Sequence, residues 1–100
     1  MPIDADKRKH TRKEVTLETV LESGGGRHQS RISDMSLGGC YVDTIATAVE
    51  GEQISLTIAY EGESQQFTGE VAYVLPGFGF GVRFTDLTEE QTDFLRRIVG

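Results

Sequence analysis

The chain has 100 residues, of which 10 are Lys or Arg and 16 are Asp or Glu, so its net charge is −6; 37% of the residues are hydrophobic. These values predict one globular domain with a single core and exclude a largely disordered chain. No apolar stretch is as long as a membrane span and no signal-peptide pattern is present, so we expect a cytoplasmic protein without membrane insertion. The single cysteine, Cys40, excludes an internal disulfide and a cysteine-based metal cage.

Half of the ten basic side chains lie in one short stretch near the N-terminus: Lys7, Arg8, Lys9, Arg12 and Lys13. We therefore predict a flexible basic segment over residues 1–13 and a folded domain over residues 14–100. The acidic domain would repel a long polyanion, so neither DNA nor RNA is an expected partner, whereas a small anion could bind at the basic segment. The alternative is a solvated tail that only keeps the protein soluble.

Six short segments have the apolar–polar alternation or the composition of β-strands. They cover residues 15–22, 28–33, 40–43, 54–60, 66–75 and 78–84. Three glycines at 24–26 predict a hairpin turn between the first two strands. Residues 34–39 predict a polar turn after the second strand, and Pro76-Gly77 predicts a turn between the last two.

The last predicted strand alternates bulky residues with glycines. Phe80, Val82 and Phe84 would share one face of it, and Gly79 and Gly81 the other. The Gly-x-Gly resembles half of a nucleotide-binding fingerprint. No helix follows it directly, so close backbone packing at a bend of a barrel is the favoured interpretation.

The sequence Thr88-Glu-Glu-Gln91 is a capping box and predicts the start of a terminal helix. Phe94, Leu95 and Ile98 form an apolar stripe on this helix, which could seal one opening of a barrel. The predicted fold class is therefore all-β with one terminal helix: a six-stranded antiparallel β-barrel closed by a C-terminal α-helix.

An enzymatic centre is a weak hypothesis for this sequence. Ser36 and Asp34 could form a triad with His10 or His28, but no nucleophile-elbow sequence surrounds the serine. The two histidines and Cys40 lack the spacing of zinc ligands. We predict a protein that is not an enzyme and that needs no metal or cofactor.

Two short motifs carry the strongest functional signal. The first, Arg-x-x-x-Arg, precedes the first predicted strand, and the second, Asp-x-Ser-x-x-Gly, follows the second strand. Their residues are Arg8, Arg12, Asp34, Ser36 and Gly39. Their order and spacing resemble those of the PilZ domain, the bacterial receptor module for the second messenger cyclic di-GMP. The resemblance covers nearly the whole chain and includes the Gly-Val-x-Phe sequence at residues 81–84 and the closing helix.

The resemblance implies a ligand with two phosphates and two guanines. An arginine fork can bridge phosphate oxygens or pair with guanine O6 and N7, so Arg8 and Arg12 are candidate binding residues. Asp34 could accept hydrogen bonds from the Watson–Crick edge of guanine, and Ser36 could donate or accept another. Gly39 would let the backbone approach the purine closely. The alternatives are solvated arginines, side chains that cap their own turn, and a glycine needed only at the entry to a strand.

Three further residues are candidates on weaker grounds. Tyr73 matches a position where PilZ domains often carry an aromatic residue near the ligand, so it could stack on a guanine or pack on the barrel. Arg31 lies three residues before Asp34 and is a second possible contact. Lys7 stands where many family members have another arginine. The resemblance implies that a basic residue at this position accompanies a stacked pair of cyclic di-GMP molecules, and lysine would support the second molecule through phosphate.

The resulting prediction is a non-enzymatic receptor that binds cyclic di-GMP and changes the conformation of its N-terminal segment. It would act on motility, exopolysaccharide or biofilm formation through a separate, unidentified protein. One alternative is a PilZ-like adaptor of pilus or flagellar machinery that binds no nucleotide. Another is a small oligonucleotide-binding barrel, against which the acidic domain counts.

Overall fold

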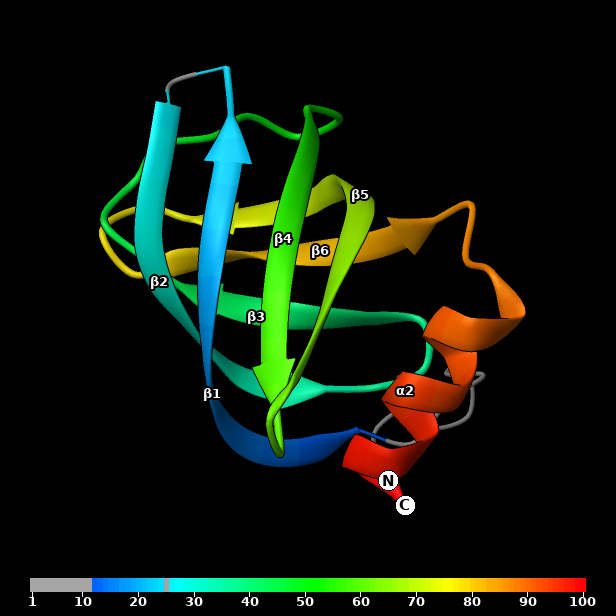
Figure 1. The fold of residues 1–100 in the computed structure, drawn as a ribbon. Coiled ribbons are helices and arrows are strands. Elements are labelled where there is room, and N and C mark those ends of the chain that lie inside the picture. Colours follow the sequence, from blue (N-terminus) through cyan, green and yellow to red (C-terminus); the bar gives the residue numbers. More distant parts are fainter. Residues whose placement is uncertain (1–11, 25) are drawn as a thin grey trace, which may run out of the picture.

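Six antiparallel strands form a closed barrel, and one helix packs against it (Figure 1). The computed structural model describes residues 12–24 and 26–100. The elements are β1 (Lys13–Ser23), β2 (Gly26–Met35), β3 (Gly39–Asp43), β4 (Gln53–Tyr60), β5 (Glu63–Leu75), β6 (Gly79–Thr85) and α2 (Glu89–Val99). The strands follow the order β1-β2-β3-β6-β5-β4 around the barrel, which confirms the predicted fold class.

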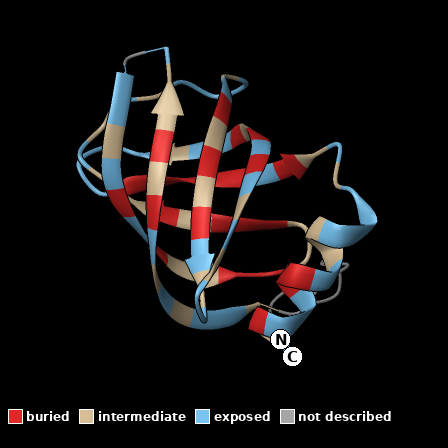
Figure 2. Ribbon diagram, in the orientation of Figure 1, coloured by how far each residue is buried: buried red, intermediate tan, exposed pale blue. Residues whose placement is uncertain are grey.

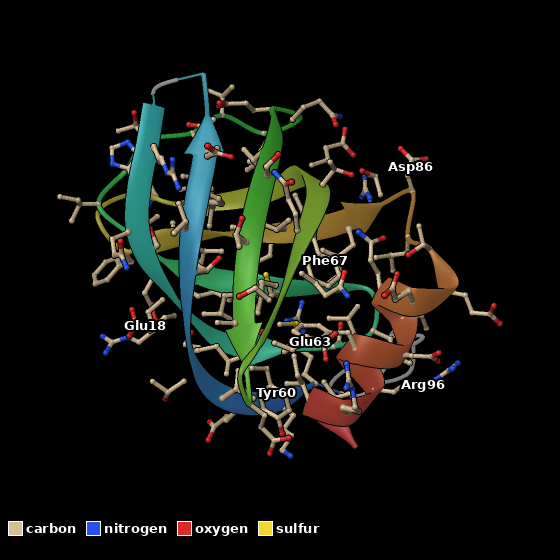
Figure 3. The ribbon with its side chains drawn as sticks, viewed as in Figure 1. Glu18, Tyr60, Glu63, Phe67, Asp86 and Arg96 are labelled. Carbon is tan, nitrogen blue, oxygen red and sulfur yellow. The ribbon has the colours of Figure 1, made fainter. Side chains whose placement is uncertain are left out.

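The core fills the barrel and continues under α2. Buried residues alternate with exposed ones along the strands, as the period-two patterns predict (Figure 2). Phe67 of β5 lies between the barrel and the helix (Figure 3). Its ring centroid is 5.1 Å from that of Phe84 in β6 and 5.9 Å from that of Phe94 in α2. The aromatic contacts therefore join the helix to the barrel core.

The helix begins at the predicted capping box. The Thr88 hydroxyl oxygen accepts a hydrogen bond from the Gln91 N–H at 3.1 Å, and Oε1 of Gln91 accepts one from the Thr88 N–H at 2.8 Å. The predicted stripe of Phe94, Leu95 and Ile98 is buried. At the other end, Nζ of Lys13 donates to the Ile98 carbonyl at 3.2 Å, which connects the start of β1 to the end of the helix. Within the part of the chain that the structure describes, no helix is long and apolar enough to cross a membrane.

Two turns differ from the sequence prediction. Asp34 and Met35 belong to β2, where we expected residues 34–39 to form a turn, so the connection to β3 is limited to residues 36–38. A polar side chain on the outer face of a strand keeps its hydration, so Asp34 does not need a loop. β5 also begins earlier than predicted. Glu61 and Gly62, with φ values of 49° and 83°, form a two-residue hairpin loop between β4 and β5.

Two β-bulges decide which polar and aromatic side chains face outward. In β2, Ile32 and Asp34 oppose consecutive residues of β3, so one extra residue lies between them. An unbulged strand would give Asp34 the inward orientation of the buried Ile32, whereas the bulge turns it outward beside Tyr41. In β5, an extra residue between Val71 and Tyr73 turns the tyrosine outward in the same way. Both bulges orient side chains that the sequence suggested as candidates for ligand binding.

Candidate ligand-binding site

An ion pair joins the two sequence motifs on the outside of the barrel. Nη1 of Arg12, the residue before β1, donates to Oδ1 of Asp34 in β2. The two residues are 22 positions apart in the chain, and the pairing of β1 with β2 brings them together. Their side chains remain 30% and 31% exposed, so both are partly screened from water and still accessible to a ligand. Asp34 therefore orients the arginine fork on the outer face.

Ser36 forms the turn between β2 and β3. Its hydroxyl oxygen accepts hydrogen bonds from the N–H groups of Gly38 and Gly39, both at 3.1 Å, and donates to the Gly39 carbonyl at 3.3 Å. Its own N–H bonds to the same carbonyl at 2.8 Å. The residue is only 5% exposed, so in this conformation its hydroxyl is engaged within the turn. The turn fixes the end of the strand that carries Asp34.

Gly39 lies where β3 meets β6. A Cβ atom at this position would lie 2.1 Å from the carbonyl oxygen of Val82, a backbone atom that cannot move aside without disturbing the strand pairing. Strand packing therefore requires a glycine here, which agrees with the alternative interpretation of Gly39 as a glycine needed at the entry to a strand. The close approach of this backbone to a purine stays a prediction.

Two tyrosines stack beside the ion pair. The rings of Tyr41 in β3 and Tyr73 in β5 have centroids 6.3 Å apart and planes inclined by 25°. Gly81 of β6 is the register partner of both, and a Cβ atom on it would lie 2.3 Å from Cε2 of Tyr73. The glycine thus makes room for the ring, which keeps 38% of its residue surface exposed. Since Tyr41 also pairs with Asp34, the ion pair and the aromatic pair form one row across the outer face.

Tyr41 belongs to this row although neither sequence motif contains it. Two features of the sequence point to it. The alternation that starts at Gly39 places residue 41 on the outer face of the strand, and Gly81, which has no side chain, leaves room for an aromatic ring. The surroundings of Tyr41 raise the pKa of its phenol. Partial burial has the largest effect, and the carboxylate of Asp43 and the neighbouring Tyr73 and Asp34 raise the pKa further. The hydroxyl therefore stays protonated at neutral pH and can act as a hydrogen-bond donor.

Cys40, next to Tyr41, points inward and is fully buried. Burial raises the pKa of its thiol above the usual range. The negative charge of Asp34 adds to this effect, and the positive charge of Arg12 opposes it. A protonated, buried thiol is a core side chain and does not take part in the site.

Arg31 lies one row further along the same face. Its register partners are Glu18 in β1 and Asp43 in β3, and all three line a hollow of about 410 Å³. Within the described residues, the arginines of the two rows are thus accompanied by carboxylates: Arg12 by Asp34, and Arg31 by Glu18 and Asp43. An anionic ligand would need further positive charge.

The remaining predicted site residues, Lys7 and Arg8, lie outside the described residues, as does most of the predicted segment 1–13. Their part in ligand binding therefore stays a prediction. Arg12 and Lys13, at the end of that segment, are held by the ion pair and by the contact with α2 described above.

The structure is a small β-barrel domain whose outer face carries an arginine, a carboxylate and an aromatic pair. The chain belongs to the PilZ domain family, whose model matches residues 6–100. No curated protein sequence matches the chain.

Solved structures share the fold at low sequence identity. The PilZ domain of YcgR from Escherichia coli with c-di-GMP has a TM-score of 0.74 and 17% identity, and the match covers 93% of this chain and 88% of that one. The PilZ domain of CeSA from a cellulose synthesizing bacterium has a TM-score of 0.70 and 18% identity, and the match covers 89% of this chain and 94% of that one. Bacillus subtilis MotI/DgrA, an inhibitor of motility, has a TM-score of 0.77 and 16% identity. The match covers 92% of this chain and 51% of that one, so this chain spans about half of its length.

Proposed function

We propose that this protein is a non-enzymatic receptor for cyclic di-GMP and that the ligand binds over the row of Asp34, Tyr41 and Tyr73. The Arg12–Asp34 ion pair carries the proposal, because it brings the two predicted motifs together at one partly exposed place on the barrel. The structural similarity to the YcgR PilZ domain, whose structure contains c-di-GMP, supports the choice of ligand.

Each side chain of the row offers a different kind of contact. The Arg12 fork has donors beyond the one that Asp34 uses, and these can bind phosphate oxygens or guanine O6 and N7. The Asp34 carboxylate can accept hydrogen bonds from guanine N1–H and the exocyclic amino group. Tyr73, which already stacks on Tyr41, can offer the exposed part of its ring to a purine.

The additional positive charge would come from the basic segment that carries Lys7 and Arg8. The like charges of this segment repel each other, and the phosphates of a bound ligand would neutralise them. The segment would then order over the outer face and present a new surface to a separate protein. Such a receptor would act in the bacterial cytoplasm, with motility and biofilm formation as candidate outputs. The similarity to an inhibitor of motility supports the first of these.

Calorimetric titration of the full chain tests the proposal. We expect saturable binding of cyclic di-GMP, weaker binding of GTP, and no binding of a short single-stranded oligonucleotide. A folded protein that binds none of the three would overturn the receptor assignment. Tight binding of the oligonucleotide would favour the oligonucleotide-binding barrel.

The second candidate function is an adaptor that binds no nucleotide. One observation favours it: Asp34 already provides Arg12 with a charge partner, so the described site is satisfied without a ligand. The same titration decides between the two functions, because an adaptor of this kind would give no heat with cyclic di-GMP and would remain folded.

A further inference from the structure

Four large hydrophobic side chains are exposed in two connections of the barrel. Ile45 and Val49, in the connection between β3 and β4, are 94% and 67% exposed. Leu75 and Phe78, at the turn between β5 and β6, are 48% and 73% exposed. We call these four residues the loop patch. The two connections lie side by side, on the side of the barrel away from α2 (Figure 1).

Hydrogen bonds hold the loop patch in place. The Thr44 N–H donates to the Phe78 carbonyl at 3.2 Å and so ties the two connections together. The Thr44 hydroxyl oxygen accepts from the Ala46 N–H at 3.1 Å and from the Ser30 hydroxyl at 3.0 Å. Further along, Oε1 of Glu52 accepts from the Val49 N–H at 3.2 Å. Apolar side chains on a connected frame of this kind are typical of a contact surface.

Two hollows adjoin the loop patch. One, of about 260 Å³, is lined by residues 44–48 and 74–77 together with Gly79. The other, of about 410 Å³, is lined by Ile45 and Phe78 and by the charged side chains of Glu18, Arg31 and Asp43. The loop patch thus offers space for bulky apolar side chains beside a mainly acidic rim. Figure 3 shows Glu18 on the outside of the barrel.

The charge of the rim limits what can cover the loop patch. The rim holds two carboxylates, Glu18 and Asp43, against one arginine, so a second copy of the chain would bring a rim of the same net negative charge, in a protein whose net charge is already −6. An anionic lipid surface and a nucleic acid would be repelled for the same reason. A protein surface in which Lys or Arg flanks bulky apolar side chains would satisfy both the apolar patch and its rim.

We propose that the loop patch is a docking surface for a partner protein with this basic and apolar chemistry. The patch also adjoins the proposed ligand site. Arg31 and Asp43 pair with each other one row beyond the pair of Asp34 and Tyr41, so a partner at the rim would lie beside a bound nucleotide. Docking itself needs no nucleotide; only its regulation by cyclic di-GMP rests on the proposed function.

Selection from random peptides tests this chemistry without knowledge of the partner. Twelve-residue peptides displayed on phage are selected against the purified full chain, and enriched sequences are measured by fluorescence anisotropy. We expect enriched peptides to combine aromatic or large aliphatic residues with Lys or Arg. The double variant I45S/F78S should weaken their binding at least tenfold, and Glu18→Gln should weaken it several-fold. The matched control Ala59→Ser, at an exposed position of β4 outside the loop patch, should leave binding unchanged.

Three results would overturn the docking surface. The first is enrichment of acidic or purely polar peptides, and the second is binding that I45S/F78S does not affect although the variant remains folded by circular dichroism. The third is occupation by something else: self-association in sedimentation, or binding to vesicles of phosphatidylcholine and phosphatidylglycerol, that I45S/F78S abolishes. All measurements are made first without nucleotide. Failure of cyclic di-GMP binding therefore overturns the proposed function alone, and loss of patch-dependent peptide binding overturns the docking surface alone.

Discussion

Substitution of Arg12 by alanine should weaken cyclic di-GMP binding more than it weakens the fold. The variant removes the fork that we assign to phosphate or guanine, and it leaves Asp34 without its charge partner on the outer face. A matched control is Arg27→Ala. Arg27 also pairs with a carboxylate, that of Glu22, at 3.9 Å, but it lies by the β1–β2 hairpin, at the opposite end of β1 from Arg12.

The exposure of the ion pair sets the expected magnitudes. With 30% and 31% of their side chains exposed, Arg12 and Asp34 lie between a surface pair, which contributes about 0–1 kcal/mol, and a buried pair, whose disruption costs about 3–5 kcal/mol. We expect the free energy of unfolding to fall by about 1 kcal/mol, which for a chain of this size lowers Tm by about 4–8 °C. Loss of one charge-assisted contact to the ligand costs about 1.5–3 kcal/mol, so Kd should rise about 10- to 150-fold.

Calorimetry on wild type and both variants, together with thermal unfolding followed by circular dichroism, checks both numbers. Arg27→Ala should keep the wild-type Kd within about twofold, because it changes the net charge by the same amount as Arg12→Ala but lies far from the proposed site. If Arg12→Ala binds cyclic di-GMP as tightly as wild type while folded, the assignment of this arginine is wrong. If Arg27→Ala loses as much affinity as Arg12→Ala, the overall charge of the protein determines binding, and the proposed location of the site is wrong.

Four further predictions concern the ligand and the scaffold. Asp34→Ala should weaken binding without unfolding the barrel, whereas Val82→Asp should unfold it because a buried unpaired charge is costly; equal loss of circular dichroism in both would make Asp34 structural. Amide exchange protection over residues 4–13 should rise when ligand saturates the protein, and full protection without ligand would contradict a switch. Native mass spectrometry should find two ligands per chain; one per chain refutes the stacked pair, and two per chain in Lys7→Leu refutes a role for this lysine. Gly81→Ala should displace the aromatic ring above it, which near-ultraviolet circular dichroism would detect as a change in the tyrosine signal while the far-ultraviolet spectrum stays the same.

The strands and the helix were predictable because each has a local pattern. The alternation in residues 15–22 reports one buried face, and the capping box at Thr88 reports the first turn of α2. The bulges in β2 and β5 have no such pattern, because an extra residue is recognised only against the partner strand. A strict alternation would have placed Asp34 and Tyr73 inside the barrel.

The part of the site that was predictable from the sequence is the part whose residues belong to the two motifs. The two motifs named Arg12 and Asp34, and strand pairing brings these residues together. The motif also named Ser36 and Gly39, but the structure gives them roles in the turn and in strand packing, which only the spatial neighbours reveal. Tyr41 belongs to no motif, and its place in the site follows from its register opposite Asp34.

The ion pair also suggests how the site could discriminate between anions. In the free protein Asp34 holds Arg12, so an incoming phosphate must compete with a carboxylate that is already in contact. A simple phosphate that displaced it would leave the partly buried carboxylate without a donor, which is unfavourable. Cyclic di-GMP instead brings guanine N1–H and amino donors that can satisfy Asp34, while its phosphates, or the O6 and N7 of a guanine, bind the released fork. Asp34 would thus favour a ligand that carries guanine and phosphate together over inorganic phosphate, and the charge of Arg12 alone would not.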